Sequence, residues 1–125
     1  MRKLVWAHAV NNKKLLQQAL HEGEINMIEC DVAFGDLITA ATTTTVQRDV
    51  ILCHPPDTFS DLSLNELLMT LTLMEPIHIH MPGLKLDFKD PASVDVSLQL
   101  VKQHNWPNPK RLWLNADILQ GPGES

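Results

Sequence analysis

The 125-residue sequence is short of positive charge and of long apolar runs. Its formal net charge is −5 and it has no basic stripe, which argues against nucleic acid and anionic membrane surfaces as partners. No stretch approaches 18 apolar residues, so we expect no transmembrane segment. The segment Met1–Trp6 lacks the apolar run of a signal peptide, and no Asn-x-Ser/Thr site occurs. These absences predict a soluble, cytoplasmic protein.

Cysteine is scarce as well. The two cysteines, Cys30 and Cys53, each stand beside an ionisable residue and alternate with it along the chain. In a strand, this alternation turns each thiol away from its polar neighbour. We therefore expect two buried thiols between strand and helix, in preference to a disulfide.

The sequence does contain five short apolar segments that carry polar side chains at alternate positions. They are Val5–His8, Ile28–Val32, Ile51–His54, Leu84–Lys89 and Leu112–Ile118. Because residues i and i+2 of a strand share a face, each segment is expected to gather its polar groups on one side. The groups so formed are Glu29 with Asp31, Lys85 with Asp87 and Lys89, and Asn115 with Asp117.

Helical signals separate most of these segments. The expected helices run from Asn11 or Asn12 to Leu20, from Ser60 to about Leu73, and onward from Asp90–Pro91, the last with Val94, Leu98 and Val101 on its buried side. The segment Ala33–Asp49 shows no helical period, and we interpret it as a long loop or irregular crossover.

Strand–helix alternation predicts an α/β fold with a parallel sheet and right-handed crossovers. The polar residues stand near the ends of their strands, where parallel α/β folds build their sites. Gly-x-Gly-x-x-Gly and P-loop motifs are absent, so a nucleotide-binding sheet has no support. An eight-stranded barrel needs roughly 250 residues. We predict a partial TIM barrel of about five parallel strands with intervening helices: a single, incomplete domain over residues 1–125, from a fragment or short isoform.

The polar face suits metal-assisted acid–base chemistry. Glu29, Asp31 and Asp87 offer carboxylate oxygens to one divalent cation, and such hard ligands favour Mg²⁺ or Ca²⁺ over Zn²⁺. His8 and His54, from separate strands, are candidates for general base and general acid beside a bound phosphate. The reaction class that this set predicts is phosphodiester cleavage, with a neighbouring hydroxyl or water as nucleophile.

Other polar residues of the same segments are candidates for substrate binding. Lys89, with Lys85, would stabilise charge on phosphoryl oxygens, and Asn115 and Asp117 extend the polar face. Each motif alone also has a structural explanation, such as a hydrogen-bonded histidine or a solvated, salt-bridged strand face. The joint site is favoured because four such motifs follow one another on successive predicted strands.

At these residues the sequence resembles the menorin family over nearly its whole length. The segments that carry the resemblance are Trp6–Asn11, Ile28–Val32, His54–Pro56, Lys85–Lys89 and Trp113–Leu119 with Gly121–Pro122. That family is regarded as related to the phospholipase C-like phosphodiesterases, which are TIM barrels. The resemblance implies His8 and His54 as the acid–base pair, Glu29, Asp31 and Asp87 as metal ligands, and Lys89 as the phosphate-contacting lysine.

Two hypotheses of function follow. The first is a menorin-family protein with a phosphodiesterase-like metal site for a small-molecule or lipid phosphodiester of the glycerophosphodiester or phospholipid type. The second is a non-catalytic binding or cell-surface adhesion module with a protein partner, which retains the site as a relic. Secreted relatives make an extracellular location the alternative to the cytoplasm.

Overall fold

The computed structural model describes residues 3–39, 46–74, 82–106 and 111–116. Its elements in these ranges are β1 (Trp6–Ala7), α1 (Lys13–His21), β2 (Met27–Leu37), β3 (Gln47–Leu52), β4 (Phe59–Ser60), α2 (Leu64–Met74), β5 (Gly83–Phe88), α3 (Ala92–Gln103) and β6 (Leu112–Asn115). Within them, no helix has both the length and the apolar character needed to cross a membrane.

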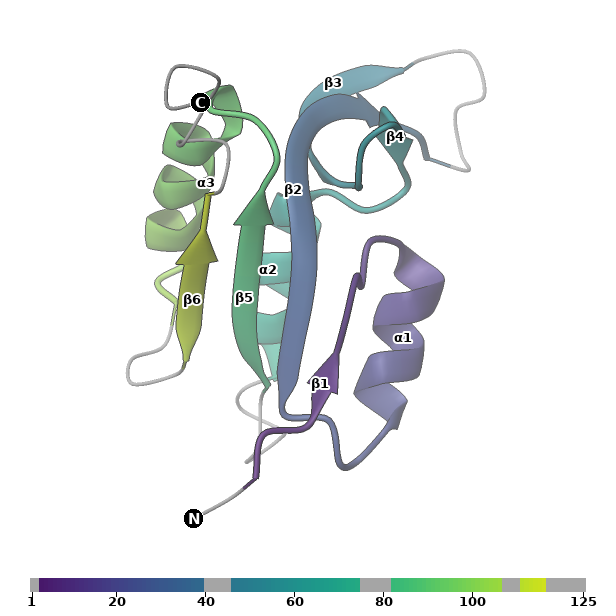
Figure 1. Ribbon diagram of the computed structural model, residues 1–125, viewed down its shortest axis with the longest axis vertical. Coiled ribbons are helices and arrows are strands. Elements are labelled where there is room, and N and C mark those ends of the chain that lie inside the picture. The colour runs from purple at the N-terminus through teal and green to yellow at the C-terminus, as the bar shows by residue number, and fades with distance from the viewer. Residues whose placement is uncertain (1–2, 40–45, 75–81, 107–110, 117–125) are drawn as a thin grey trace, which may run out of the picture.

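The sheet is parallel along its main path. The strands lie in the order β1-β2-β5-β6, and each neighbouring pair on that path is parallel. Figure 1 shows β2 as the long central strand, with α2 behind the sheet and α1 and α3 beside it. The predicted α/β class is confirmed, and the parallel strands with three helices are consistent with part of an α/β barrel.

The region after Val32 differs from the prediction. Ala33–Leu37 was expected in a loop but continues β2, and β3 then returns antiparallel beside it, pairing Val32 with Leu52 and Leu37 with Gln47. The physical reason is the length of the connection: a parallel neighbour needs a crossover of a dozen or more residues, and only the nine residues 38–46 separate Leu37 from Gln47. Figure 1 shows the end of β2 curling over with β3 and β4, a short strand that the sequence reading missed.

Helix ends follow the sequence signals. Asn12 rather than Asn11 caps α1, and its side chain accepts a hydrogen bond from the Leu15 amide at 2.8 Å. Ser63 does the same for α2 through the Glu66 amide at 3.0 Å, so α2 begins at Leu64, and Ser60, where the helix was expected to begin, lies in β4. In α3 one expectation was wrong, because Leu98 is 41% exposed while the small residues Ser93 and Ser97 are buried against the rest of the protein.

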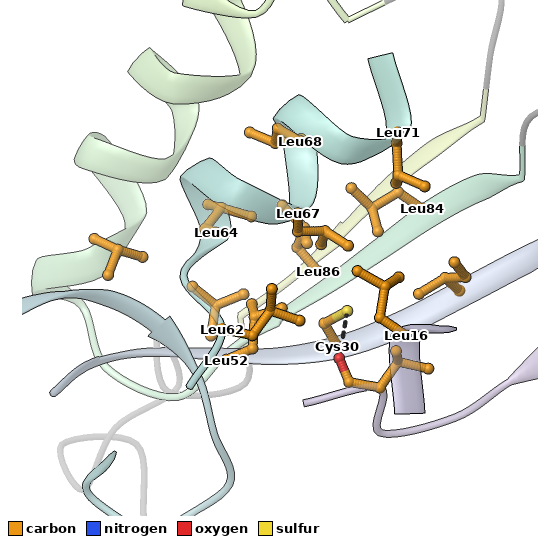
Figure 2. Packing of buried hydrophobic residues seen from close by; sticks show 14 of the residues in the cluster. Leu16, Cys30, Leu52, Leu62, Leu64, Leu67, Leu68, Leu71, Leu84 and Leu86 are labelled. Carbon is orange, nitrogen blue, oxygen red and sulfur yellow. Dashed lines mark hydrogen bonds between the residues drawn. The ribbon is translucent and has the colours of Figure 1, made fainter. Parts of the chain in front are cut away.

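The core lies between the helices and one face of the sheet. Leu64, Leu67, Leu68 and Leu71 of α2 are fully buried against apolar side chains of β2 and β5 (Figure 2). Cys30 belongs to this cluster, and its Sγ donates to the Val10 carbonyl oxygen at 3.2 Å. Both Cys30 and Cys53 are buried free thiols, as predicted.

Candidate metal centre

Three carboxylates from two neighbouring strands converge on the face of the sheet opposite this core. In the parallel register of β2 and β5, Asp31 pairs with Asp87 and Glu29 with Lys85. One side-chain oxygen from each of Glu29, Asp31 and Asp87 lies within 4.8 Å of the other two. The predicted alternation therefore brings the carboxylates of the three acidic residues into one cluster.

Lys89 occupies the edge of this carboxylate cluster. Its Nζ lies 3.1 Å from Asp87 Oδ2 and 3.4 Å from Asp31 Oδ1. Partial burial alone would lower the pKa of Lys89, but the hydrogen bond and charge of Asp87, together with the charge of Asp31, outweigh it and raise the pKa. Lys89 is therefore held in its charged form beside the carboxylates.

The donor set fits a hard divalent cation. The side chain of Asp31 is 5% exposed, and those of Glu29 and Asp87 are 14% and 15% exposed. Among the described residues, Lys89 is the one lysine that pairs with these carboxylates, which leaves the three acidic groups short of positive charge in a poorly solvated place. All three offer oxygen, the ligand atom that Mg²⁺ and Ca²⁺ take.

Hydrogen bonds from outside the cluster hold the carboxylates in place. The Asn11 side chain makes two bonds to Asp31: its Oδ1 accepts from the Asp31 amide at 3.0 Å, and its Nδ2 donates to Asp31 Oδ2 at 2.9 Å. The Ala9 amide donates to Glu29 Oε1 at 2.7 Å, and Asn115 Nδ2 donates to Asp87 Oδ1 at 3.2 Å. These contacts orient the acidic groups and offset part of the cost of their burial.

The two predicted histidines lie in different settings. His8 follows β1 with its Nδ1 3.9 Å from Glu29 Oε1, and its side chain is 73% exposed. His54 follows β3 and is also exposed, and its Nδ1 lies 2.5 Å from the Pro55 carbonyl oxygen. In the described part of the chain, His54 makes no hydrogen bond or ion pair with the carboxylate cluster. Because a carbonyl oxygen only accepts, Nδ1 would be the donor in this contact.

A cavity of about 380 Å³ lies beside β3 and β4. Asn11 and His54 both line it, and Asn11 also holds Asp31. The Cys53 amide, one residue before His54, donates to the Asp31 carbonyl oxygen at 3.0 Å. This backbone bond holds the segment after β3 against β2 at Asp31.

Of the remaining predicted site residues, only some contact the carboxylate cluster. Lys85 and Asn115 lie on the same face, beside Glu29 and Asp87 in the strand register. Of these two residues, only Asn115 makes a described hydrogen bond to the carboxylate cluster. Asp117 lies outside the described residues. Glu29 and Asp31 stand within β2 rather than at its end, because β2 continues past them to pair with β3.

Sequence reasoning did not find Asn11 as a site residue. The signal was present in the pair Asn11–Asn12, since a helix start uses one capping side chain and leaves the other free for another task. Two tryptophans also lie near the site: Trp6 stacks on the exposed ring of His8, and Trp113 lies against Trp6.

Comparison with known proteins identifies the family of this chain. The family model described as the menorin N-terminal domain matches residues 1–125. The chain belongs to the menorin family. A menorin-family relative, protein FAM151B of Homo sapiens, is 33% identical over 120 residues, which cover 96% of this chain. The match spans 39% of that relative's own length, and no solved structure matches this menorin-family chain.

Proposed function

We propose that this menorin-family chain carries a metal-dependent phosphodiesterase-like site for a small or lipid phosphodiester. The observation that carries the proposal is the convergence of Glu29, Asp31 and Asp87, whose oxygens lie within 4.8 Å, with Lys89 at their edge. The resemblance to phospholipase C-like phosphodiesterases supports the same set of residues.

Each group has a distinct task in this proposal. Glu29, Asp31 and Asp87 would hold Mg²⁺ or Ca²⁺, and such a cation polarises phosphoryl oxygens and neutralises their charge when bound. The Lys89 ammonium, kept charged by its neighbours, stabilises the extra negative charge that the phosphoryl group gains during the reaction.

The two histidines transfer the protons. As the nucleophile's oxygen bonds to phosphorus, one imidazole takes the proton from its hydroxyl group or water. As the bond from phosphorus to the leaving oxygen breaks, the other imidazole donates a proton to that oxygen, so the charges balance. Among the described contacts no hydrogen bond engages Nε2 of His54, and the Nδ1 of His8 lies 3.9 Å from Glu29 Oε1.

The experiment is a screen of glycerophosphodiesters and lysophospholipids for hydrolysis with Mg²⁺, Ca²⁺ or EDTA. We expect hydrolysis that EDTA abolishes. His8→Gln and His54→Gln should each lower kcat by about 10²- to 10⁴-fold, the usual share of general acid–base catalysis. His104→Gln is the matched control, because His104 bonds to Asn65 on the helices and should leave kcat unchanged.

Two outcomes would contradict the enzyme. If the divalent cations raise the melting temperature but no phosphodiester is cleaved, the site is a binding site without catalysis, as an adhesion module would have. If the cations change neither melting nor hydrolysis, the carboxylate cluster is only a hydrogen-bonded network.

A further inference from the structure

The imidazole ring of His8 has few polar contacts that would fix its orientation. It follows a two-residue strand, its side chain is 73% exposed, and its nearest charged partner, Glu29, lies 3.9 Å away. Glu29 Oε1 already accepts a hydrogen bond from the amide of Ala9. An exposed side chain with so few contacts populates several rotamers and must lose that freedom before it can act at a fixed atom.

One aromatic contact opposes this freedom. Trp6 stacks on His8 with ring centroids 5.6 Å apart and planes only 13° from parallel. The two residues are at i and i+2, so both side chains leave the backbone toward the face that carries Glu29. The near-parallel geometry fixes the plane of the imidazole, which the long contact with Glu29 does not do.

Trp6 is supported in turn by a residue from the opposite edge of the strand order. Its ring centroid lies 5.4 Å from that of Trp113, with the planes tilted by 50°. Trp6 belongs to β1 and Trp113 to β6, and the strand order β1-β2-β5-β6 puts two strands between them. The indoles therefore meet across the same face of the sheet that holds the carboxylate cluster.

We propose that Trp6 is a positioning residue that fixes the His8 ring beside Glu29, and that Trp113 in turn fixes Trp6. The proposal rests on the proposed function only where it predicts kinetics. A stacked aromatic pair of this kind multiplies the population of the stacked rotamer by roughly 2- to 12-fold. With Trp113 behind it, the stack joins the first and last strands of the sheet path to one histidine.

The first test is structural and needs no substrate. An indole face shifts the protons of a stacked imidazole upfield, so the ring protons of His8, identified by their loss in His8→Gln, should be displaced in the NMR spectrum. All spectra are recorded in one buffer at one pH. Trp6→Leu should abolish the displacement, Trp6→Phe should keep part of it, and Trp113→Leu should reduce it.

Trp106→Phe is the matched control. Trp106 packs against the core on the other side of the sheet, and its replacement should leave the His8 protons unmoved. Unshifted His8 protons in the unaltered chain, or a shift that survives Trp6→Leu, would overturn the proposal. Because Trp6→Phe retains an aromatic ring, it separates loss of stacking from loss of folding.

The second test is kinetic. Trp6→Leu should lower kcat by up to about 10²-fold, the scale of a misplaced catalytic group, while KM stays near its original value. In a His8→Gln background, Trp6→Leu should have no further effect, because the group that it positions is gone. An equal loss in both backgrounds would overturn the positioning role. If no phosphodiester is cleaved at all, the proposed function fails while the NMR comparison still decides the stack.

Discussion

The two faces of β2 and β5 differ in almost every physical respect. On the helix side, Leu84, Leu86 and Phe88 form an apolar row and are at most 2% exposed. On the other side, Lys85 and Asp87 of the same strand lie among carboxylates and are only partly buried. The period of two lets six consecutive residues supply packing to one face and charge to the other.

The comparison separates where stability and chemistry come from. The helix face gains free energy from burying apolar surface, without a requirement for any one partner. The polar face loses free energy when its carboxylates are desolvated, and it needs specific partners such as Asn11 and Lys89 to recover it. A change on the first face should therefore alter stability alone, and a change on the second should alter ion binding.

The largest effect is expected on the helix face. Leu86→Ala should lower the free energy of unfolding by about 2–5 kcal/mol, because it opens a cavity in a fully buried cluster. Urea unfolding measures the loss. The folded variant should keep the metal response of the original chain. Leu114→Ala, at a 48% exposed position of β6, is the control and should cost far less. Equal losses at both positions would show that burial on this face does not set its contribution to stability.

The polar face should show the opposite result. In EDTA, Asp31→Asn should leave the free energy of unfolding nearly unchanged, since it removes one of three like charges while keeping the side chain's shape. At a concentration of Mg²⁺ or Ca²⁺ near 100 times the Kd, the original chain should gain about 2.7 kcal/mol and the variant none. Thermal melting with and without the ion measures both. The exposed Asp95→Asn should retain the gain, and a gain retained by Asp31→Asn as well would exclude this cluster as the ion site.

The polar face was predictable from sequence because its information is local. Alternation within Glu29–Asp31 and Lys85–Asp87 fixes which side chains share a face, and parallel pairing then brings the two pairs together. The β3 direction was not predictable in this way, because it depends on whether β2 ends at Val32 or continues to Leu37.

Contacts between distant segments were also out of reach. The bonds from Asn11 to Asp31 depend on where α1 begins relative to β2, and the stack of Trp6 with Trp113 depends on the reach of two side chains across the sheet. No periodicity encodes either contact. The alternation of residues along the strands predicts the acidic cluster, whereas the side chains that hold it in place are known only from the folded structure.

A smaller effect should distinguish the two adjacent asparagines. Asn12→Ala removes the helix cap and should cost about 1 kcal/mol of stability with no change in ion affinity. Asn11→Ala should cost a similar amount, because it leaves two polar groups of Asp31 without partners, and it should also weaken Mg²⁺ or Ca²⁺ binding by about 10- to 100-fold. Calorimetric titration of both variants measures the affinities. Matching affinities for the two variants would show that Asn11 only supports the fold.

The smallest effect should come from the boundary between the two faces, at Cys30. Complete burial, followed by the charges of Glu29 and Asp31, raises the pKa of the Cys30 thiol well above 9.0. Both folded and unfolded chains hold the thiol proton at pH 7, so the thiol then contributes no pH dependence. As the pH rises through 9.0, the unfolded chain releases this proton and the folded chain retains it, so the free energy of unfolding falls by up to about 1.4 kcal/mol per pH unit.

Urea unfolding between pH 7 and 10 measures this slope. The upper limit lies below 10.5, the ordinary pKa of lysine, so that the raised pKa of Lys89 adds little to the slope. Cys30→Ser keeps a donor for the Val10 carbonyl oxygen but does not titrate, so its slope should be shallower. Cys53, whose pKa is also raised by burial, leaves a residual slope in that variant. Parallel curves for the two chains would mean that the Cys30 thiol is in contact with water in the folded chain. The apolar face and the charged face would then not be sharply separated at Cys30.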